Sequence, residues 1–371
     1  MTREQADARS ALPPHVLEMW NMMYGLVRTQ VLNVAASLGL ADILADGAKD
    51  ATALAQATNT HAESLDRVLR CLVSCGVLSR DVEGLYSLTP TGVLFRGDSS
   101  PSGRAGAIFY GSHFIWDAWG SLLENVRTGK TAFELAHGAP VFEYLSTRPD
   151  DLRINTEFMT EMAGPRLLAA ARSYEFPPSG VVIDVGGGEG AMLIAVLQAN
   201  PGLRGVLLEL PELIEPARDL LKVAGLADRC TLTAGDFFDG VPSGGDIYIL
   251  SNILHDWDDE HARRILANCR RAMNAGAKLF IVDAIMPEDP PFTLAALDLQ
   301  MMVVLGGKQR TEPEYRALIE SEGFHLTKVV PSGMMERSVR ASTSACPSVS
   351  ASTTCRRSCG RALARRRKAC R

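Results

Sequence analysis

The stretch "GVVIDVGGGEG", residues 180–190, decides the fold class of this 371-residue chain. An apolar run of strand length ends near Asp184 and passes into glycines, which let a backbone turn tightly and approach a ligand closely. A helix-like apolar run, "AMLIAVLQANP", follows at once. A glycine run alone is weak evidence, but a strand that enters a helix through glycines indicates a ligand-binding α/β sheet.

The same alternation of apolar strands and amphipathic helices continues after the glycines. We predict strands in "RGVLLELP", "RCTLTAGDFF", "GDIYILSNILHDW" and "AKLFIVDAIMP", and helices in "ELIEPARDLLKVAGL" and "DDEHARRILANCRRAM". This order predicts an α/β fold with a mostly parallel sheet covered by helices on both faces. Ligands of such sheets bind at the carboxyl ends of the strands, so these ends should carry the site.

The residues at three strand ends indicate the kind of ligand. Asp184 and Glu189 would repel a pyrophosphate, whereas a carboxylate at this place suits an ammonium or sulfonium group. Glu209 ends the next strand about twenty residues on, where an acid typically takes the ribose hydroxyls. Asp236 would accept from an adenine amino group and Phe237 would stack on the base. A nucleoside with an amino-acid end is S-adenosylmethionine; the loop contacts we predict for it are Gly186, Gly188 and Gly235.

The segment before residue 176 has a different, helical pattern. Residues 15–95 begin with a long apolar stretch rich in Met and aromatic residues, and continue as two short helices, a turn and a small strand pair, which predicts a winged-helix-like module. Its second helix offers Arg67 and Arg70 against Glu63 and Asp66, a balance that argues against DNA binding. The apolar surface of the first helices exceeds what a small module can bury, so we expect a homodimer.

Breakers and composition divide the chain into four parts. The stretch "FPPSG" (176–180) separates the segment with a helical pattern from the segment with the α/β pattern. We predict a helical, winged-helix-like dimerisation domain in 1–104, a helical region lining the acceptor pocket in 105–176, a cofactor-binding domain in 177–333 and a basic tail in 334–371.

Composition limits the location and the partners. The chain lacks an apolar run of about 18 residues that could span a bilayer, and its start is polar, so we expect a cytoplasmic protein that is not bound to a membrane. The net charge is −5, but the tail holds nine Arg and one Lys against one acid, which leaves −14 on residues 1–333. We expect no nucleic-acid partner for so acidic a body. The cysteines have no metal-type spacing, and we expect no metal.

Several stretches in order resemble one enzyme family. They are "DVGGGEG", "LELPELIEPA", "GDFF", "LHDWDDEHARRIL", "DAIMPE" and "LGGKQRTEPEYRALIESEGF", with "GKTAFEL", "FEYLSTRPD" and "FMTEM" in the helical part. From about residue 15 to 333 the chain resembles the S-adenosylmethionine-dependent small-molecule O-methyltransferases, which include plant caffeate and flavonoid enzymes and bacterial natural-product relatives. The resemblance implies a Rossmann-like class I methyltransferase domain behind a helical dimerisation domain, and methylation of a phenolic hydroxyl on an aromatic or polyketide-like molecule.

The resemblance also implies a catalytic group. The general base of the family falls on His255, and an imidazole that titrates near neutrality suits that role. Its two flanking carboxylates fall on Asp283, where plant members commonly have the longer Glu, and on Gln309, where many members have Glu. An imidazole with fewer carboxylate neighbours is less basic, so these departures make the plant substrates a poor guide.

Further contacts follow from the same matches. Ser251 and Trp257 would contact the cofactor, and Asp256 would bind the substrate. Phe158, Met162 and Met301 fall where relatives line the acceptor pocket, although Met on a helix is as often simple core. Two alternatives stay open: the same fold with N- or C-methylation, decarboxylation or hydroxylation, and a catalytically degenerate binding or regulatory protein.

The last 38 residues, 334–371, change character to Arg, Ser, Ala and Cys. The family fold closes with one more apolar antiparallel strand, and the sequence here offers none. We expect an aberrant, disordered ending with an unfilled position in the sheet; a basic tail that binds an acidic partner is the alternative.

Overall fold

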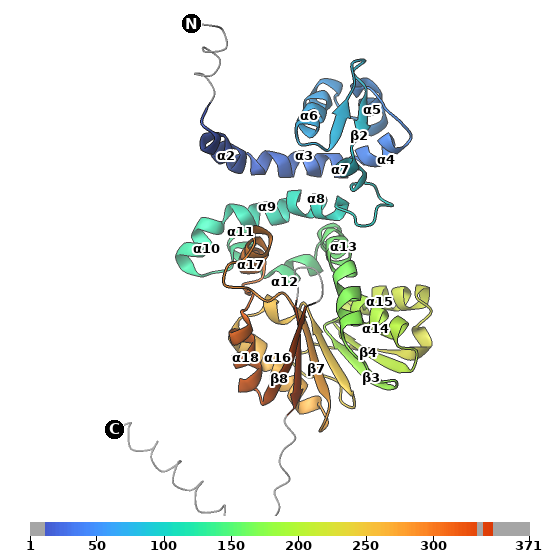
Figure 1. The fold of residues 1–371 in the computed structure, drawn as a ribbon, viewed down its shortest axis with the longest axis vertical. Coiled ribbons are helices and arrows are strands. Elements are labelled where there is room, and N and C mark those ends of the chain that lie inside the picture. Colours follow the sequence, from blue (N-terminus) through green and yellow to red (C-terminus); the bar gives the residue numbers. More distant parts are fainter. Residues whose placement is uncertain (1–11, 332–336, 344–371) are drawn as a thin grey trace, which may run out of the picture.

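The computed structural model describes residues 12–331 and 337–343. An N-terminal unit leads the chain (Figure 1). Two helices, α2 and α3, form an arm that leads into three further helices, a two-stranded antiparallel sheet and a last helical turn. Their bounds are α2 Pro14–Met23, α3 Gly25–Ser37, α4 Leu40–Ala45, α5 Ala51–Thr58, α6 Ala62–Ser74, β1 Leu78–Arg80, β2 Tyr86–Leu88 and α7 Pro90–Val93.

Six helices connect this unit to the sheet domain. They are α8 Arg104–Gly111, α9 His113–Gly120, α10 Leu122–Thr128, α11 Ala132–His137, α12 Val141–Ser146 and the long α13 Pro149–Ser173. A seventh helix, α17 (Phe292–Val304), comes from much later in the sequence and packs among them (Figure 1). Val303 and Val304 share one apolar cluster with Phe109, Phe114 and Phe133. This long-range packing joins the helical region to the loop that follows α17.

The sheet domain has seven strands in the order β5-β4-β3-β6-β7-β9-β8. The strands β3 to β7 are parallel, which confirms the predicted sheet. Their bounds are β3 Gly180–Val185, β4 Leu203–Glu209, β5 Cys230–Ala234, β6 Ile247–Ser251 and β7 Lys278–Asp283. The strand order reverses between β3 and β6, and this switch point is where such sheets bind ligands.

Helices cover both faces of the sheet (Figure 1). One apolar cluster joins α13, α14 and α15 to one face of the sheet, and a second cluster joins α16 and α18 to the other. The bounds are α14 Ala191–Ala199, α15 Pro211–Val223, α16 Asp259–Ala272 and α18 Glu312–Ser321, with short 3₁₀ turns η1 Ala227–Arg229 and η2 Leu254–Asp256. Because β3 and β6 are buried on both faces, their sequences are continuous apolar runs rather than alternating ones.

The expectation of a missing closing strand is wrong. Strand β9 (Arg337–Thr343) lies between β7 and β8 (Phe324–Pro331) and is antiparallel to both. The tail that we placed at 334–371 therefore contributes a strand to the sheet. A ladder is built from backbone N–H and C=O groups, so a short stretch without large apolar residues can still complete it. Residues 344–371, for which we expected disorder, lie outside the described residues.

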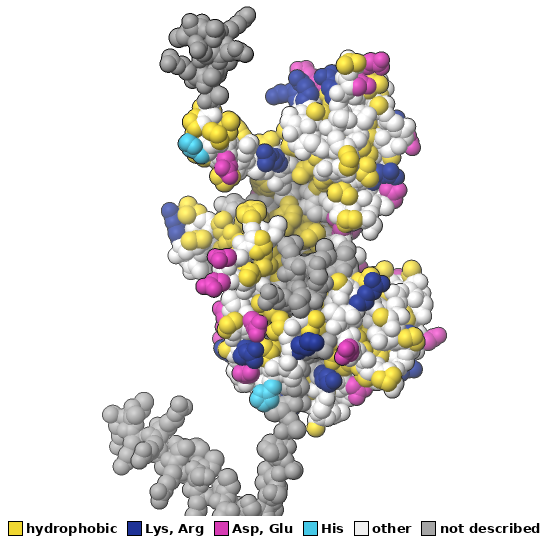
Figure 2. Space-filling model, in the orientation of Figure 1, with side chains coloured by type: hydrophobic (Ala, Val, Ile, Leu, Met, Phe, Trp, Pro, Cys, Tyr) yellow, Lys and Arg dark blue, Asp and Glu magenta, His cyan; other side chains and the backbone are white. Residues whose placement is uncertain are grey.

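Apolar side chains are exposed along the α2–α3 arm (Figure 2). Trp20 and Tyr24 stack on one another with ring centroids 5.8 Å apart. Exposed apolar residues of the arm include Leu17, Met19, Met22, Met23, Leu26 and Val27. Within the described residues, none of the helices combines the length and the apolar character that crossing a bilayer requires.

Candidate active site

A cavity of about 430 Å³ opens at the carboxyl ends of β3, β4, β5 and β6. Nine predicted site residues line it: Gly186, Gly188, Glu209, Gly235, Asp236, Phe237, Ser251, Asp256 and Trp257. The opposite wall comes from α12 and α13, through Phe142, Asn155, Thr156, Met159, Thr160 and Leu167. The cavity thus lies between the strand ends of the sheet and helices of the 105–176 region, for which we predicted a place at the acceptor pocket.

The glycine loop is shaped by backbone conformations that side chains disfavour. Gly186, Gly188 and Gly190 have φ of +68°, +59° and +85°. A Cβ at Gly187 would collide with the Asp184 carboxylate beneath it. The loop is therefore closed against the sheet on one side and exposes its backbone to the cavity on the other.

Glu209 fixes the loop and faces the cavity. Its Oε2 accepts a hydrogen bond from Gly188 N at 2.7 Å, and its Oε1 accepts from Leu210 N at 2.8 Å. Burial raises the pKa of this carboxyl, and the two backbone donors lower it. Each oxygen keeps a lone pair for a further donor, so the carboxylate can still take a pair of ribose hydroxyls.

Asp184 does not line the cavity, unlike the contact we predicted. It lies beneath the glycine loop, is fully buried, and neither of its oxygens has a hydrogen-bond partner among the described residues. Burial, and then the nearby Glu209 charge, raises its pKa from 3.8 to about 7. Asp184 is therefore separated from the cavity by the glycine loop.

This carboxyl gives the apo chain a specific pH dependence. A raised folded-state pKa contributes stability that is present below about pH 4 and is lost as pH rises through about 7. We expect Asp184→Asn to become more stable than the parent, with an advantage that grows by about 2 to 3 kcal/mol between pH 5 and pH 8. Urea unfolding at both pH values measures this, and exposed Asp239→Asn is the control. An advantage that is the same at both pH values would contradict the assignment.

Aromatic rings close the β5 end of the cavity. The rings of Phe237 and Trp257 meet edge to face, with centroids 6.1 Å apart at 84°. Asp236 Oδ1 accepts a hydrogen bond from Phe238 N at 2.7 Å. This bond fixes the turn that carries the Asp236 and Phe237 side chains. Asn268 of α16 holds the same turn by donating to the carbonyls of Phe237 and Phe238. This arrangement suits a flat base next to a polar edge.

Ser251 and the residue after it mark the end of β6. Ser251 lines the cavity, and its buried hydroxyl has no hydrogen-bond partner among the described residues. Asn252 has φ of +54°, an uncommon conformation outside glycine. The left-handed residue turns the chain out of the sheet and into η2, which carries His255.

His255 lies behind the cavity wall with both ring nitrogens engaged. It is 6% exposed. Its Nδ1 lies 3.2 Å from Asp283 Oδ1 and 3.2 Å from Gln309 Nε2. Its Nε2 lies 3.3 Å from Oδ1 of Asp256, which lines the cavity. The structure thus brings the three predicted catalytic residues together, with two carboxylates on opposite sides of the imidazole.

The buried Arg310, which sequence reasoning missed, clamps this loop. Its guanidinium donates to the carbonyls of Leu254 at 2.5 Å and Trp257 at 2.8 Å, and pairs with Asp259 at 2.9 Å. Close packing adds to the clamp, because a Cβ at Gly307 would overlap the His255 carbonyl. The one hint in the sequence is that Arg310 directly follows Gln309, which the family resemblance places beside His255.

The predicted acceptor residues do not share one wall. Phe158 is buried and stacks on Phe109, with centroids 4.0 Å apart. Met301 is buried in α17, whereas Met162 is exposed on α13. None of the three lines the 430 Å³ cavity, where α13 instead contributes Met159, one turn before Met162.

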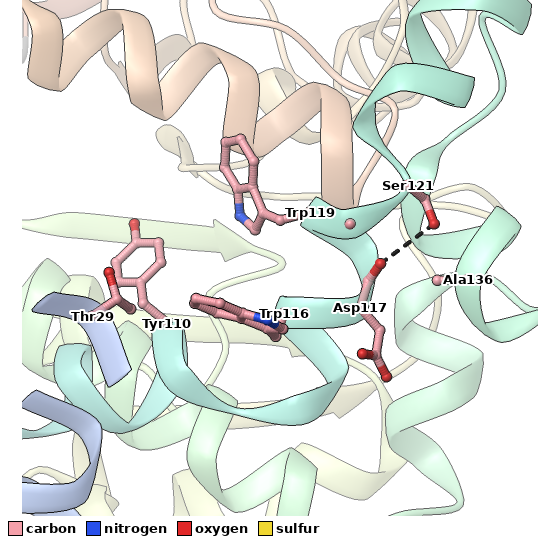
Figure 3. Close-up of a pocket in the computed structure, with 8 residues that line it drawn as sticks. Thr29, Tyr110, Trp116, Asp117, Trp119, Ser121 and Ala136 are labelled. Carbon is pink, nitrogen blue, oxygen red and sulfur yellow. Dashed lines mark hydrogen bonds between the residues drawn. The ribbon is translucent and has the colours of Figure 1, made fainter. Parts of the chain in front are cut away.

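A second, more open cavity of about 700 Å³ lies between α3 and the helices α8 to α11. Its aromatic walls are Tyr110, Trp116 and Trp119 (Figure 3). Trp119 Nε1 donates to Gln300 of α17 at 3.0 Å, and the Tyr110 ring meets Phe158 edge to face. The cavity is therefore tied both to α17 and to the aromatic core beside α13.

This geometry places a cavity at the switch point of the sheet directly beside a buried imidazole. Residues 119–325 match the O-methyltransferase domain family and residues 20–98 match the O-methyltransferase dimerisation domain family. The chain belongs to the S-adenosylmethionine-dependent O-methyltransferase family, which confirms the resemblance, the class of enzyme and the cofactor.

Relatives extend the match over most of the chain. A phenazine O-methyltransferase of Lysobacter antibioticus is 42% identical over 311 residues, which is 84% of this chain and 91% of that protein. The structure of a mitomycin 7-O-methyltransferase superposes with a TM-score of 0.86 at 34% identity, covering 91% of this chain and 99% of that chain. A neocarzinostatin-biosynthesis O-methyltransferase, solved with S-adenosylmethionine and 2-hydroxy-5-methyl naphthoic acid, has a TM-score of 0.76 at 31% identity, with 85% and 96% covered.

The relatives are not uniform in the atom that they methylate. A phenazine-1-carboxylate N-methyltransferase of Pseudomonas aeruginosa is 34% identical, over 84% of this chain and 92% of that protein. The family therefore fixes the cofactor and the class of reaction, and leaves the receiving atom to the site itself.

Proposed function

We propose that the chain methylates a phenolic hydroxyl of an aromatic or polyketide-like small molecule, with His255 as the general base. The observation that carries this proposal is the imidazole between two carboxylates, Asp283 at Nδ1 and the cavity-lining Asp256 at Nε2. A phenol with a pKa near about 10 is a weak nucleophile until a base takes its proton. A buried base at the edge of the cofactor cavity meets that need.

In this proposal, different residues of the site bind the cofactor and take up the proton. Glu209, Ser251 and Phe237 would hold the cofactor, because a carboxylate, an unpartnered buried hydroxyl and an aromatic face all line one cavity of suitable size. Bound S-adenosylmethionine supplies an electrophilic methyl group. His255 Nε2 takes the phenol proton, and the Asp283 carboxylate stabilises the imidazolium that results. Asp256 then serves as a hydrogen-bond partner for the acceptor at the same place.

The acceptor class rests on the apolar and aromatic lining and on the relatives. Met159 and Phe142 face the cavity from the helical side, and Phe142 lies nearly parallel to Trp257. The names of the relatives mention a phenazine, mitomycin and 2-hydroxy-5-methyl naphthoic acid, each of which has a fused-ring skeleton. A fused-ring phenol is the acceptor that fits both observations.

Methylation of a ring nitrogen is the second candidate, because an N-methylating relative matches over the same share of the chain. A neutral amine or ring nitrogen attacks without losing a proton first. The two candidates therefore differ in their need for His255, which makes them separable by experiment.

The assembly and location are also proposals. We infer a homodimer in which a second copy covers the exposed apolar side chains of the α2–α3 arm, in line with the dimerisation-domain match. Helices α5 and α6 with the β1–β2 pair would be the winged-helix-like module. We retain a cytoplasmic location, which cell fractionation would check, and no nucleic-acid partner.

Product analysis on a phenol panel tests the function. The full chain, S-adenosylmethionine and hydroxyphenazines, hydroxynaphthoates or hydroxybenzoates are incubated, and mass spectrometry with NMR locates any added methyl group. We expect an aryl methyl ether from at least one fused-ring phenol. Methylation restricted to nitrogen or carbon across a panel that includes matched amines would overturn the proposal.

Loss of the Glu209 carboxylate should weaken cofactor binding strongly. We expect Glu209→Ala to raise the Kd for S-adenosylmethionine by about 100-fold, because hydrogen bonds to a charged group contribute about 1.5–3 kcal/mol each. Isothermal titration calorimetry measures it, and Glu212→Ala, on the exposed first turn of α15, is the control. Unchanged binding in Glu209→Ala would show that the ribose hydroxyls lie elsewhere.

A further inference from the structure

A buried tyrosine, Tyr315, contacts the carboxylate that lies beside His255. Tyr315 of α18 is fully buried and its hydroxyl donates to Asp283 Oδ2 at 2.8 Å. The other oxygen of the same carboxylate, Oδ1, faces His255 Nδ1 at 3.2 Å. Asp283 thus links Tyr315, through a hydrogen bond, to His255, through a charge contact at Nδ1, because its Oδ1 has no hydrogen-bond partner among the described residues. On its other side, His255 contacts the cavity-lining Asp256.

Two groups compete for the Nδ1 position of His255. Asp283 can only accept there while it is ionised, which places the ring proton on Nδ1 and leaves Nε2 with its lone pair. The Gln309 amide nitrogen lies equally close and can only donate, which places the ring proton on Nε2. Only the first tautomer leaves Nε2 free to take a proton, so the charge state of Asp283 selects the working form.

We propose that Tyr315 is a positioning residue of the catalytic site, which keeps Asp283 oriented and ionised so that His255 holds its proton on Nδ1. This inference rests on the proposed function. The position of Tyr315 is fixed by its own helix: α18 begins with a capping box between Thr311 and Glu314. The ring also faces the Arg310 guanidinium, whose centre lies 6.0 Å from the ring centroid.

The groups around Asp283 explain why one hydroxyl matters. Burial raises the pKa of Asp283 to about 6, while the His255 ring, the Tyr315 hydroxyl and the Arg310 charge lower it and Asp256 raises it. The pKa of Asp283 thus already lies close to neutral pH. If the Tyr315 hydroxyl were removed, the carboxyl would be protonated over much of the working pH range.

The test is Tyr315→Phe in the full chain, which removes only the hydroxyl. The apparent pKa of the coupled His255–Asp283 pair should rise by about half a unit or more, because the lost donor favoured the ionised carboxylate. Histidine NMR titration reads this without any acceptor. With a phenol that the parent methylates, the acidic limb of kcat should move up by a similar amount, with kcat recovering at high pH and KM changing less than about twofold.

The matched control is Tyr248→Phe. Tyr248 is also fully buried, but its single hydroxyl proton lies between the carbonyls of Pro242 and Ala272, both within hydrogen-bond distance, near the other end of β6. It should leave both the NMR titration and the acidic limb unchanged. If Tyr315→Phe lowers kcat equally at every pH, or leaves the pair's apparent pKa unchanged, the proposal fails. If the parent methylates no phenol while the NMR shift is still seen, the proposed function fails and the positioning by Tyr315 stands.

Discussion

His255→Ala should lower kcat for methylation of a phenol by about 10² to 10⁴-fold, the usual contribution of a general base. The imidazole lies behind the cofactor cavity rather than in its lining, so the Kd for S-adenosylmethionine should stay within about twofold of the parent value. Steady-state kinetics with calorimetry on the same preparation measures both quantities.

The control for this substitution is His325→Ala, since His325 is exposed on β8. It should leave both constants at the parent values. A His255→Ala enzyme that keeps kcat would show that the phenol reaches the methyl group already ionised, and that the imidazole is structural.

Arg310→Leu should have the largest effect on stability. The side chain is completely buried and donates to two carbonyls on either side of His255. Its removal leaves two carbonyl acceptors without their donor, whereas the partly exposed Asp259 keeps Lys308 as an ion-pair partner. A buried acceptor left unsatisfied costs about 1–3 kcal/mol, so the two together cost about 2–6 kcal/mol. We expect the free energy of unfolding to fall by that amount in urea titration, with kcat lowered because the loop that carries the base loses its clamp.

Arg316→Leu separates this effect from the loss of any arginine. Arg316 lies on α18, which begins just after Arg310, but its ion pairs with Glu312 and Glu320 are exposed, so a change of about 1 kcal/mol or less is expected. Equal destabilisation by both substitutions would contradict the clamp.

The sheet and the cofactor end of the site could be predicted from the sequence because each rests on a local pattern. The glycine loop, Glu209 and the Asp236–Phe237 turn each follow directly from an apolar strand, and parallel strands bring their carboxyl ends to one edge. The gathering of His255, Asp283 and Gln309 came from the family resemblance. The spacing of these residues along the sequence does not show that the loop after α17 folds back against His255.

What the sequence did not show depends on long-range packing. Asp184 precedes the glycines as a ligand contact would, yet the loop folds over it and excludes it from the cavity. Tyr315 and Arg310 look like ordinary helix-start residues until α18 is packed against β7. Strand β9 was missed because its sequence lacks an apolar pattern, while the ladder needs only backbone groups.

The measurement that tests the central claim most directly compares a fused-ring phenol with the matched arylamine, in the parent and in His255→Ala. Single-turnover methyl transfer from saturating S-adenosylmethionine gives each rate without product release. The account predicts that the parent forms the methyl ether and that His255→Ala loses this reaction at least about 100-fold. A parent that methylates only the amine, at a rate that His255→Ala leaves unchanged, would contradict it.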